Sequence, residues 1–440
     1  MRFRTPAVVV ALTFSAFAIA QNTVQNAPSP TDAPVTLTLQ DALARARANS
    51  PEFLSAQTDA ALAHEDKVQA RAALLPAINY ETQYLYTQGT GSDVPRFIAN
   101  NSVHEYIAQG NAHEVLNVGP GGFADYRRAA AAEALAKAKA EVAARGLVVT
   151  VTQAYYALIV TQRKYANAQA AATEANTFLR HSQELERGGE VAHSDVIKAQ
   201  IQANDRARDL RETQLAMNTA RLDLAVLVFP KFDLNFTVVD DLRLASTLPT
   251  LTEAERMAGE KNPDLRAALA SLEVARHEVT SARSALLPTL TLDYWYGIDA
   301  NHFATKTDGV RNLGYSAAAT IELPIWNWGA SQSKIKQATL RRTLAEHELS
   351  FAQRQLVARL REFHAEADAA RNELDGLRQS ADLAAESLRL TTLRYQAGEA
   401  TALEVVDAQN TLVQARNAYD DGEVRYRVAI ANLQTVTGNF

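Results

Sequence analysis

Two proline-containing stretches decide the fold: "LLPAINYETQYLY" at Leu74–Tyr86 and "LLPTLTLDYWYG" at Leu286–Gly297. Each follows a long alanine-rich run with helical periodicity, and each changes after its proline to an alternating pattern. Such alternation is typical of a β-strand with two unlike faces. The sequence therefore predicts a mainly helical protein that turns into strand twice, at matching places.

The matching places belong to an internal duplication. The residues 49–51, Asn-Ser-Pro, correspond to residues 261–263, Lys-Asn-Pro, at an offset of 212 (263 − 51). Near the end of each half, "GEVAHSDVIKAQ" from Gly189 corresponds to "GEATALEVVDAQ" from Gly398, at an offset of 209 (398 − 189). Two elements that keep nearly one offset indicate two structural repeats. We predict repeats over 37–229 and 251–440, joined by a linker over 230–250.

Each repeat is predicted to contribute two strands, at about residues 77–87 and 103–117, then 289–298 and 312–324. These segments are close to the length that a tilted strand needs to cross a bilayer. Their tyrosines, together with Trp295, are residue types that favour a membrane interface. A water-soluble sheet with one buried face would show the same alternation, so this alternative stays open here.

The helices are unusually long. Residues 123–187 contain no proline, and a helix of that length would extend about 97 Å. This length indicates coiled-coil packing. The last helix carries an unbroken heptad seam, formed by Leu412, Ala415, Tyr419, Gly422, Tyr426, Ala429, Leu433 and Val436. Small alanine side chains allow close approach, so we expect a wall one helix thick rather than a thick core.

Composition narrows the class of protein. The chain has 440 residues, of which 47% are hydrophobic and 21% charged, with a net charge of −6. This is a globular balance, and it offers no basic surface for nucleic acid. There are no cysteines, which excludes disulfides.

The first 20 residues are predicted to be a signal peptide. Arg2 and Arg4 precede an apolar run from Ala7 to Ala20 that ends in a small-residue cleavage pattern. An uncleaved anchor helix is the alternative. Residues 21–36 are predicted to be a flexible N-terminal segment. No later stretch approaches 18 consecutive apolar residues, so we expect no transmembrane helix after residue 20.

Four strands cannot close a barrel in lipid, because an open edge leaves backbone groups unpaired. Three copies would supply twelve strands (3 × 4). With this arrangement, the "PIWNWG" segment at Pro324–Gly329 and the "YQAGEATALEVVDAQNTL" segment at Tyr395–Leu412, the chain resembles the TolC-like outer-membrane efflux protein family. The resemblance covers nearly all of the chain after residue 20.

The resemblance implies a homotrimer in the outer membrane of a Gram-negative-type cell. Its twelve strands would form a β-barrel in lipid, and its long helices would form an α-barrel across the periplasm. Such channels contact a periplasmic adaptor protein and an inner-membrane pump. They export drugs, metals, other small molecules or proteins from the periplasm to the exterior. A periplasmic coiled-coil scaffold or adaptor without membrane insertion is the alternative function.

The resemblance also implies where the periplasmic end closes. Glu404 and Asp407 stand at the positions of the family's constriction carboxylates, and an i, i+3 spacing places them on one helix face. Asp195 and Tyr395 are candidates for a lock between the two tips. Ala400 stands where some members have a locking arginine. The alternative for these charged residues is an ordinary solvated helix surface.

Three glycines are predicted to reverse the chain between paired helices: Gly188, Gly189 and Gly398. The resemblance implies that these tips contact the adaptor, although a simple helix reversal needs nothing more. The nine histidines show no metal-ligand spacing. No nucleophile triad or phosphate loop is present either. We therefore expect no catalytic site, no metal site and no cofactor, and an exported enzyme is an alternative without a supporting motif.

Overall fold

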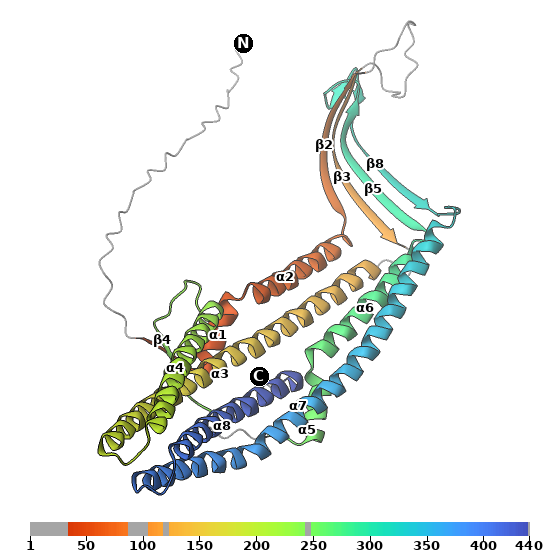
Figure 1. Cartoon of the computed structure of the whole chain (residues 1–440). Helices are drawn as coiled ribbons and strands as arrows, with labels where there is room; N and C mark the ends of the chain where they lie inside the picture. Colours follow the sequence, from red (N-terminus) through yellow and green to blue (C-terminus); the bar gives the residue numbers. More distant parts are fainter. Residues whose placement is uncertain (1–33, 87–103, 118–122, 243–247, 439–440) are drawn as a thin grey trace, which may run out of the picture.

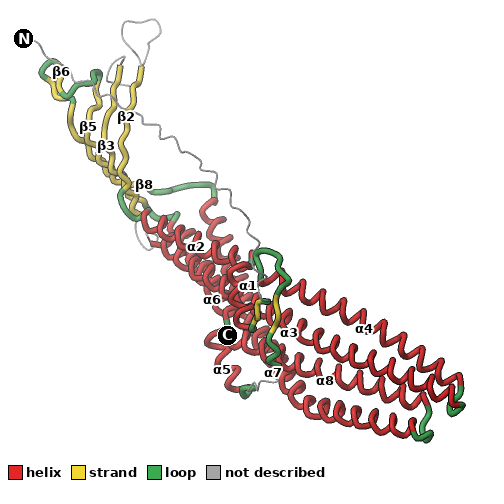
Figure 2. Tube along the Cα trace, turned by 90° about the vertical axis from the view of Figure 1, so that its left-hand side faces the viewer, coloured by secondary structure: helices red, strands yellow, loops and turns green. Residues whose placement is uncertain are grey.

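The computed structural model describes residues 34–86, 104–117, 123–242 and 248–438. The molecule is long, with a curved sheet at one end and two helical hairpins at the other (Figures 1 and 2). This confirms the predicted fold class, mainly helical with a small β part. The predicted signal peptide, residues 1–20, and residues 21–33 lie outside the described residues.

The helices repeat in pairs of equal or nearly equal length. In the first half they are α1 (Leu39–Asn49), α2 (Pro51–Ala72), α3 (Ala124–Gly188) and α4 (His193–Val228). In the second half they are α5 (Leu251–Lys261), α6 (Pro263–Ser284), α7 (Ala330–Gln396) and α8 (Ala402–Thr437). The first, second and fourth members of each half have 11, 22 and 36 residues in both copies. The internal duplication is therefore structural as well as sequential.

Local sequence sets where the short helices begin. The Thr38 hydroxyl accepts a hydrogen bond from the Asp41 amide at 3.1 Å, and the Asp41 carboxylate accepts one from the Thr38 amide, so the pair forms a capping box. Ser50 caps α2, and Asn262 caps α6, each directly before a proline in the first helical turn. Proline costs nothing there, because the amides of the first turn have no partner within the helix. The matching caps explain why both halves bend at the same place.

The four long strands form one antiparallel sheet in the order β2–β3–β5–β8 (Figure 1). Their bounds are Ala77–Tyr86, His104–Asn117, Thr289–Ala300 and Leu313–Glu322. The central pairing of β3 with β5 joins the two halves of the chain. At that seam His113 lies opposite Asp293, and their side chains form an ion pair at 2.7 Å. Among the described residues, β2 and β8 each have one edge without a partner strand.

The two faces of the sheet differ in chemistry. Directly opposed residues share a face, and one face carries an apolar set with many exposed members: Ile78, Tyr80, Tyr84, Tyr294, Tyr296, Tyr315 and Ile321. The other face is mainly polar, with Asn79, Glu81, Gln109, Asn111, His113, Asp293 and Ser316, but it also carries Trp295, which therefore does not share a face with the tyrosines. Exposed tyrosines on ten-residue strands are unusual for a surface in water.

The short strands were not predicted. Strand β1 (Val35–Leu37) pairs in parallel with β4 (Phe236–Val238), and the Tyr155 hydroxyl donates to the carbonyls of Leu37 at 3.2 Å and Val239 at 2.7 Å. Residues 35 and 36 were expected to be flexible, so that expectation is wrong for them. Three-residue strands are too short to show alternation, and their partners lie far apart in sequence. Two further two-residue strands, β6 (Lys306–Thr307) and β7 (Val310–Arg311), pair beyond the end of the sheet.

The second hairpin, α7 with α8, packs along the heptad seam. None of the eight predicted seam residues is exposed. Gly422 shows how close the helices come, because a Cβ atom there would lie 2.7 Å from Leu377 Cδ1 and 3.4 Å from Leu374 Cδ2. Glycine therefore fits this seam position, where the Cβ atom of an alanine would displace the neighbouring leucine side chains.

The main hydrophobic core surrounds the middle of α3. Tyr155, Leu158, Ile159, Leu224 and Val228 are almost completely buried there. Among the described residues, α3 alone contains an 18-residue window that is apolar enough to cross a membrane by composition, and 44% of that window is buried. This window is more apolar than we expected for any segment after residue 20. Packing against α1 and α4 accounts for the apolar residues of this core.

Backbone contact makes Gly297 the most constrained position of the sheet. A Cβ atom there would lie 2.3 Å from the carbonyl oxygen of Ala108 and 2.4 Å from Gln109 Cα. We predict that Gly297→Ala destabilises the folded protein by about 1–3 kcal/mol, seen as a lower thermal unfolding midpoint in detergent. Its cross-strand neighbour Gly314 has nothing within 4 Å of the same added atom. Equal midpoints for Gly297→Ala and Gly314→Ala would contradict this.

Candidate functional site at the hairpin tips

Each hairpin tip contains one glycine in a left-handed backbone conformation. Gly189 ends α3 at φ 77°, and Gly398 follows α7 at φ 75°. Side chains rarely adopt such angles, so these two glycines allow the tight reversals. Gly188 is different, because it is the last residue of α3 and has no positive φ. Gly188 therefore lies directly before the reversal without using a left-handed backbone angle itself.

Tyr395 joins the two hairpins just above the tips. Its side chain is buried, its hydroxyl lies 3.1 Å from the Ser182 hydroxyl, and its ring centroid lies 5.1 Å from that of Phe178. Both partners belong to α3. The contact lies within a buried apolar cluster that includes Leu388 and Val405. Tyr395 thus lies where a lock between the tips would act, and its partner is Ser182 rather than an acid.

Glu404 lies in the first turn of α8, the helix that follows the second tip. Its carboxylate accepts a hydrogen bond from the Thr401 amide at 3.0 Å, and its own amide donates to the Thr401 hydroxyl at 3.3 Å. Arg394 contacts the other carboxylate oxygen at 3.4 Å. The bond from the Thr401 amide, together with the Thr401 hydroxyl and Arg394, lowers the pKa of Glu404 below its usual value. The capping box was missed, although the Thr-x-x-Glu spacing is its sequence signal.

Asp407 lies one turn further along α8. It is exposed, and within the described part of the chain its carboxylate forms no hydrogen bond or ion pair with another side chain. Asp195, at the start of α4, contacts Lys198 at 3.3 Å. Two of the predicted acids are therefore neutralised by neighbours in the same hairpin, while Asp407 carries an uncompensated charge.

Arg394 supplies a positive charge at the second tip, where Ala400 has none. One guanidinium nitrogen contacts Glu404, and another donates to the Glu399 carbonyl at 3.1 Å. This arginine precedes the tip glycine, whereas the arginine implied by the resemblance would follow it. The sequence motif could not show that a residue on the other side of the turn reaches the same carboxylate.

A polar cluster links the hairpins farther from the tips. Arg163 on α3 contacts Asp240 at 2.6 Å, Asp420 at 3.2 Å and, at short range, Glu423. Asn167 also donates to Asp420 at 2.9 Å. Burial raises the pKa of Asp420, although Arg163 acts in the opposite direction. Sequence reasoning missed this cluster, because its members lie on two helices and the linker and follow no short motif.

The geometry can now be compared with known proteins. The "Outer membrane efflux protein" family model matches residues 256–439. Outer membrane protein TolC of Vibrio cholerae is 24% identical over 90% of this chain and 89% of its own length. The chain is a TolC-like outer membrane efflux protein.

Other relatives of this efflux protein agree over similar lengths. The alkaline protease secretion protein AprF of Pseudomonas aeruginosa is 22% identical over 91% of this chain and 84% of its own. The outer membrane channel CmeC of Campylobacter jejuni has a TM-score of 0.81 at 16% identity, over 99% of this chain and 94% of its own. VceC of Vibrio cholerae has a TM-score of 0.80 at 19% identity, over 91% and 96%. The family and the fold are those of outer-membrane channels of efflux and secretion systems.

Charge on Glu404 should control the first turn of α8. A carboxylate with a lowered pKa stabilises the folded state above its unfolded pKa, and this contribution is lost as pH falls through the lowered value. At pH 7 we predict that Glu404→Gln speeds amide exchange at Thr401 by roughly two- to fivefold. Hydrogen exchange with mass spectrometry measures this.

The same experiment contains its own controls. At a pH low enough to protonate the carboxylate, wild type and Glu404→Gln should exchange at equal rates. The nearby exposed Glu399 offers a matched variant, Glu399→Gln, which should change nothing at Thr401. An unchanged rate in Glu404→Gln at pH 7 would show that the capping box contributes nothing to the tip.

Proposed function

We propose that three copies of this chain form the passive outer-membrane duct of a tripartite export system. The single observation that carries this proposal is the sheet, whose outer strands β2 and β8 have unpaired edges and whose exposed face is rich in tyrosine. In lipid, backbone groups at such edges would lack partners at a large cost. Pairing β2 of one copy with β8 of the next satisfies them and gives twelve strands (3 × 4).

The alternative, a periplasmic scaffold that never enters lipid, explains less. It would leave the exposed face with Ile78, Tyr80 and Tyr315 in water, and two strand edges open to aggregation. The outer-membrane location of the relatives also favours the duct. In this proposal residues 1–20 act as a signal peptide that is removed on export.

Partners and cargo follow from the same plan. We propose that the tips, with Gly189 and Gly398, contact a periplasmic adaptor protein, which connects the duct to an inner-membrane pump. Relatives are named for alkaline protease secretion and for pyoverdine export, so the shared architecture serves cargo of very different size. The duct proposed here carries out no chemical step, and its cargo class includes small molecules, drugs, metals or proteins.

The tips are proposed to form the narrow periplasmic mouth. Asp407 and Glu404 would then meet their copies around the threefold axis, giving six carboxylates (3 × 2). Acidic rings of this kind select cations. Because Arg394 offsets Glu404, the field at the mouth would come mainly from Asp407.

Assembly can be measured directly. We predict that the purified protein is a trimer in detergent, because a single copy leaves β2 and β8 unpaired. Light scattering with refractive-index detection gives the protein mass within the micelle. A folded, non-aggregating monomer would contradict the proposal.

The mouth can be tested by electrical recording. We predict that a trivalent cation added on the periplasmic side blocks the wild-type channel, and that Asp407→Asn raises the half-blocking concentration by at least about tenfold. Glu404→Gln should have a smaller effect, since Arg394 already offsets that charge. Asp59→Asn makes the same chemical change at an exposed site on α2 and should leave the block unaltered. Equal block in Asp407→Asn and wild type would place Asp407 away from the mouth.

A further inference from the structure

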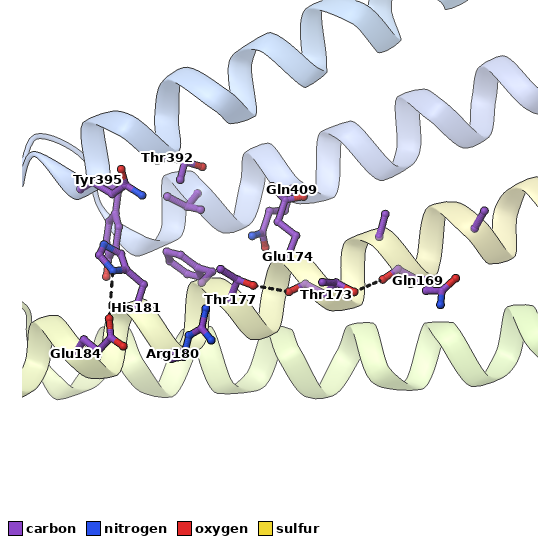
Figure 3. A pocket seen from close by; sticks show the side chains of 15 residues that line it. Gln169, Thr173, Glu174, Thr177, Arg180, His181, Glu184, Thr392, Tyr395 and Gln409 are labelled. Atoms are coloured by element: carbon purple, nitrogen blue, oxygen red, sulfur yellow. Dashed lines mark hydrogen bonds and ion pairs between the residues drawn. The ribbon is translucent and has the colours of Figure 1, made fainter.

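A cavity of about 890 Å³ lies inside each copy, between α3 and the tip end of the α7–α8 hairpin (Figure 3). All of its lining residues come from one chain. Its volume is within the range of sites that bind drug-sized molecules. Tyr395 lines it together with its neighbours Phe178 and Val405, whereas Glu404, Asp407 and Asp195 do not.

The inner part of the cavity has polar groups that the protein leaves unused. Gln409 is only 5% exposed, and its side-chain oxygen has no hydrogen-bond partner among the described residues. The Nε2 atom of His181 is likewise buried without a partner. Unpaired polar atoms in such positions are costly, because they have given up water without a replacement. A ligand that satisfied them would remove this cost.

Glu174 adds a charge at the mouth of the cavity. In Figure 3 its side chain points from α3 toward Gln409 on α8. Within the described residues the structure gives this carboxylate no hydrogen bond or ion pair, and the surrounding protein atoms raise its pKa despite the charge of Arg416. The other charged lining residues are Arg180, Glu184 and His181, so the lining is acidic by one charge when His181 is neutral.

Apolar surface lies beside this charge. Phe178 and Tyr395 present aromatic rings 5.1 Å apart, and Val405 contributes an aliphatic group. The faces of aromatic rings attract cations. The Tyr395 hydroxyl is already occupied by Ser182, so its ring is the part that remains for a ligand.

We propose that this cavity is a binding site for drug-sized organic cations. Glu174 balances the positive charge, Phe178 and Tyr395 contact the apolar body, and the Gln409 amide and His181 imidazole hydrogen-bond to polar groups of the ligand. The site lies in the wall of the helical hairpins of a single copy. It is separate from the carboxylates at the proposed mouth and does not depend on the export role.

Two ions of nearly identical shape and opposite charge test the ligand class. Tetraphenylphosphonium is a cation and tetraphenylborate an anion. Equilibrium dialysis of the full-length protein in detergent, against a protein-free micelle blank, measures the binding of each. We expect saturable binding of tetraphenylphosphonium at one site per chain, and no saturable binding of tetraphenylborate.

Variants connect the binding to the cavity. Glu174→Gln keeps the side-chain shape and should weaken tetraphenylphosphonium binding at least about tenfold. Glu362→Gln removes an exposed carboxylate elsewhere on α7 and should bind as wild type does. Size-exclusion elution and the thermal midpoint confirm that each variant is folded.

Three outcomes would overturn the proposal: no saturable tetraphenylphosphonium binding, equal binding by wild type and Glu174→Gln, or equal affinity for tetraphenylborate. The measurement involves neither membrane nor transport. A negative result would therefore leave the proposed duct untouched, and a failed assembly test would not affect this site.

Discussion

Backbone hydrogen bonds between β3 and β5, continued by the packing of α3 against α6, place the two halves of the chain side by side at the sheet end. The halves then run as separate helical arms, with α3 and α7 of 65 and 67 residues. At about 1.5 Å per residue each arm extends close to 100 Å. A small angular error at the sheet would separate the arms widely at the tips, so further contacts must hold them together along their length.

Those contacts change in character along the arms. Near the middle, the apolar core around Tyr155 and the Arg163 cluster join α3 to the linker and α8. Near the tips the described contacts between the arms are the hydroxyl pair of Ser182 and Tyr395, the contacts of Asn410 with Gln202 and Arg206, and a cluster of small and aromatic side chains. Deletion of a fully buried charged partner costs more than loss of a neutral hydrogen bond. The arms are thus joined more firmly at their middle than at their ends.

Much of this plan could be predicted from the sequence, because its signals are periodic. Alternation identified the sheet, the proline positions identified the helix breaks, and the heptad seam through Gly422 identified the close packing of α8. The rest depends on pairs that are distant in sequence. Arg163 meets residues 77 and 257 positions away, and β1 pairs with β4 across about two hundred. The sequence motif did not show that Glu404 caps α8, because a carboxylate at this position is expected both for a helix cap and for a constriction.

The small β1–β4 pair determines where the N-terminal end of the described chain lies. It fixes Val35 beside the middle of α3, and Thr38 at the start of α1 borders the same 280 Å³ cavity as Gln434 near the end of α8. Both ends of the described chain therefore lie near the middle of the molecule, between the sheet and the hairpin tips (Figure 1). A domain fused to either end of the described chain would lie beside the middle of the molecule, away from the sheet and from the hairpin tips. The two ends of the described chain are also close together, so a short linker could join them in a circularly permuted protein that begins at another position.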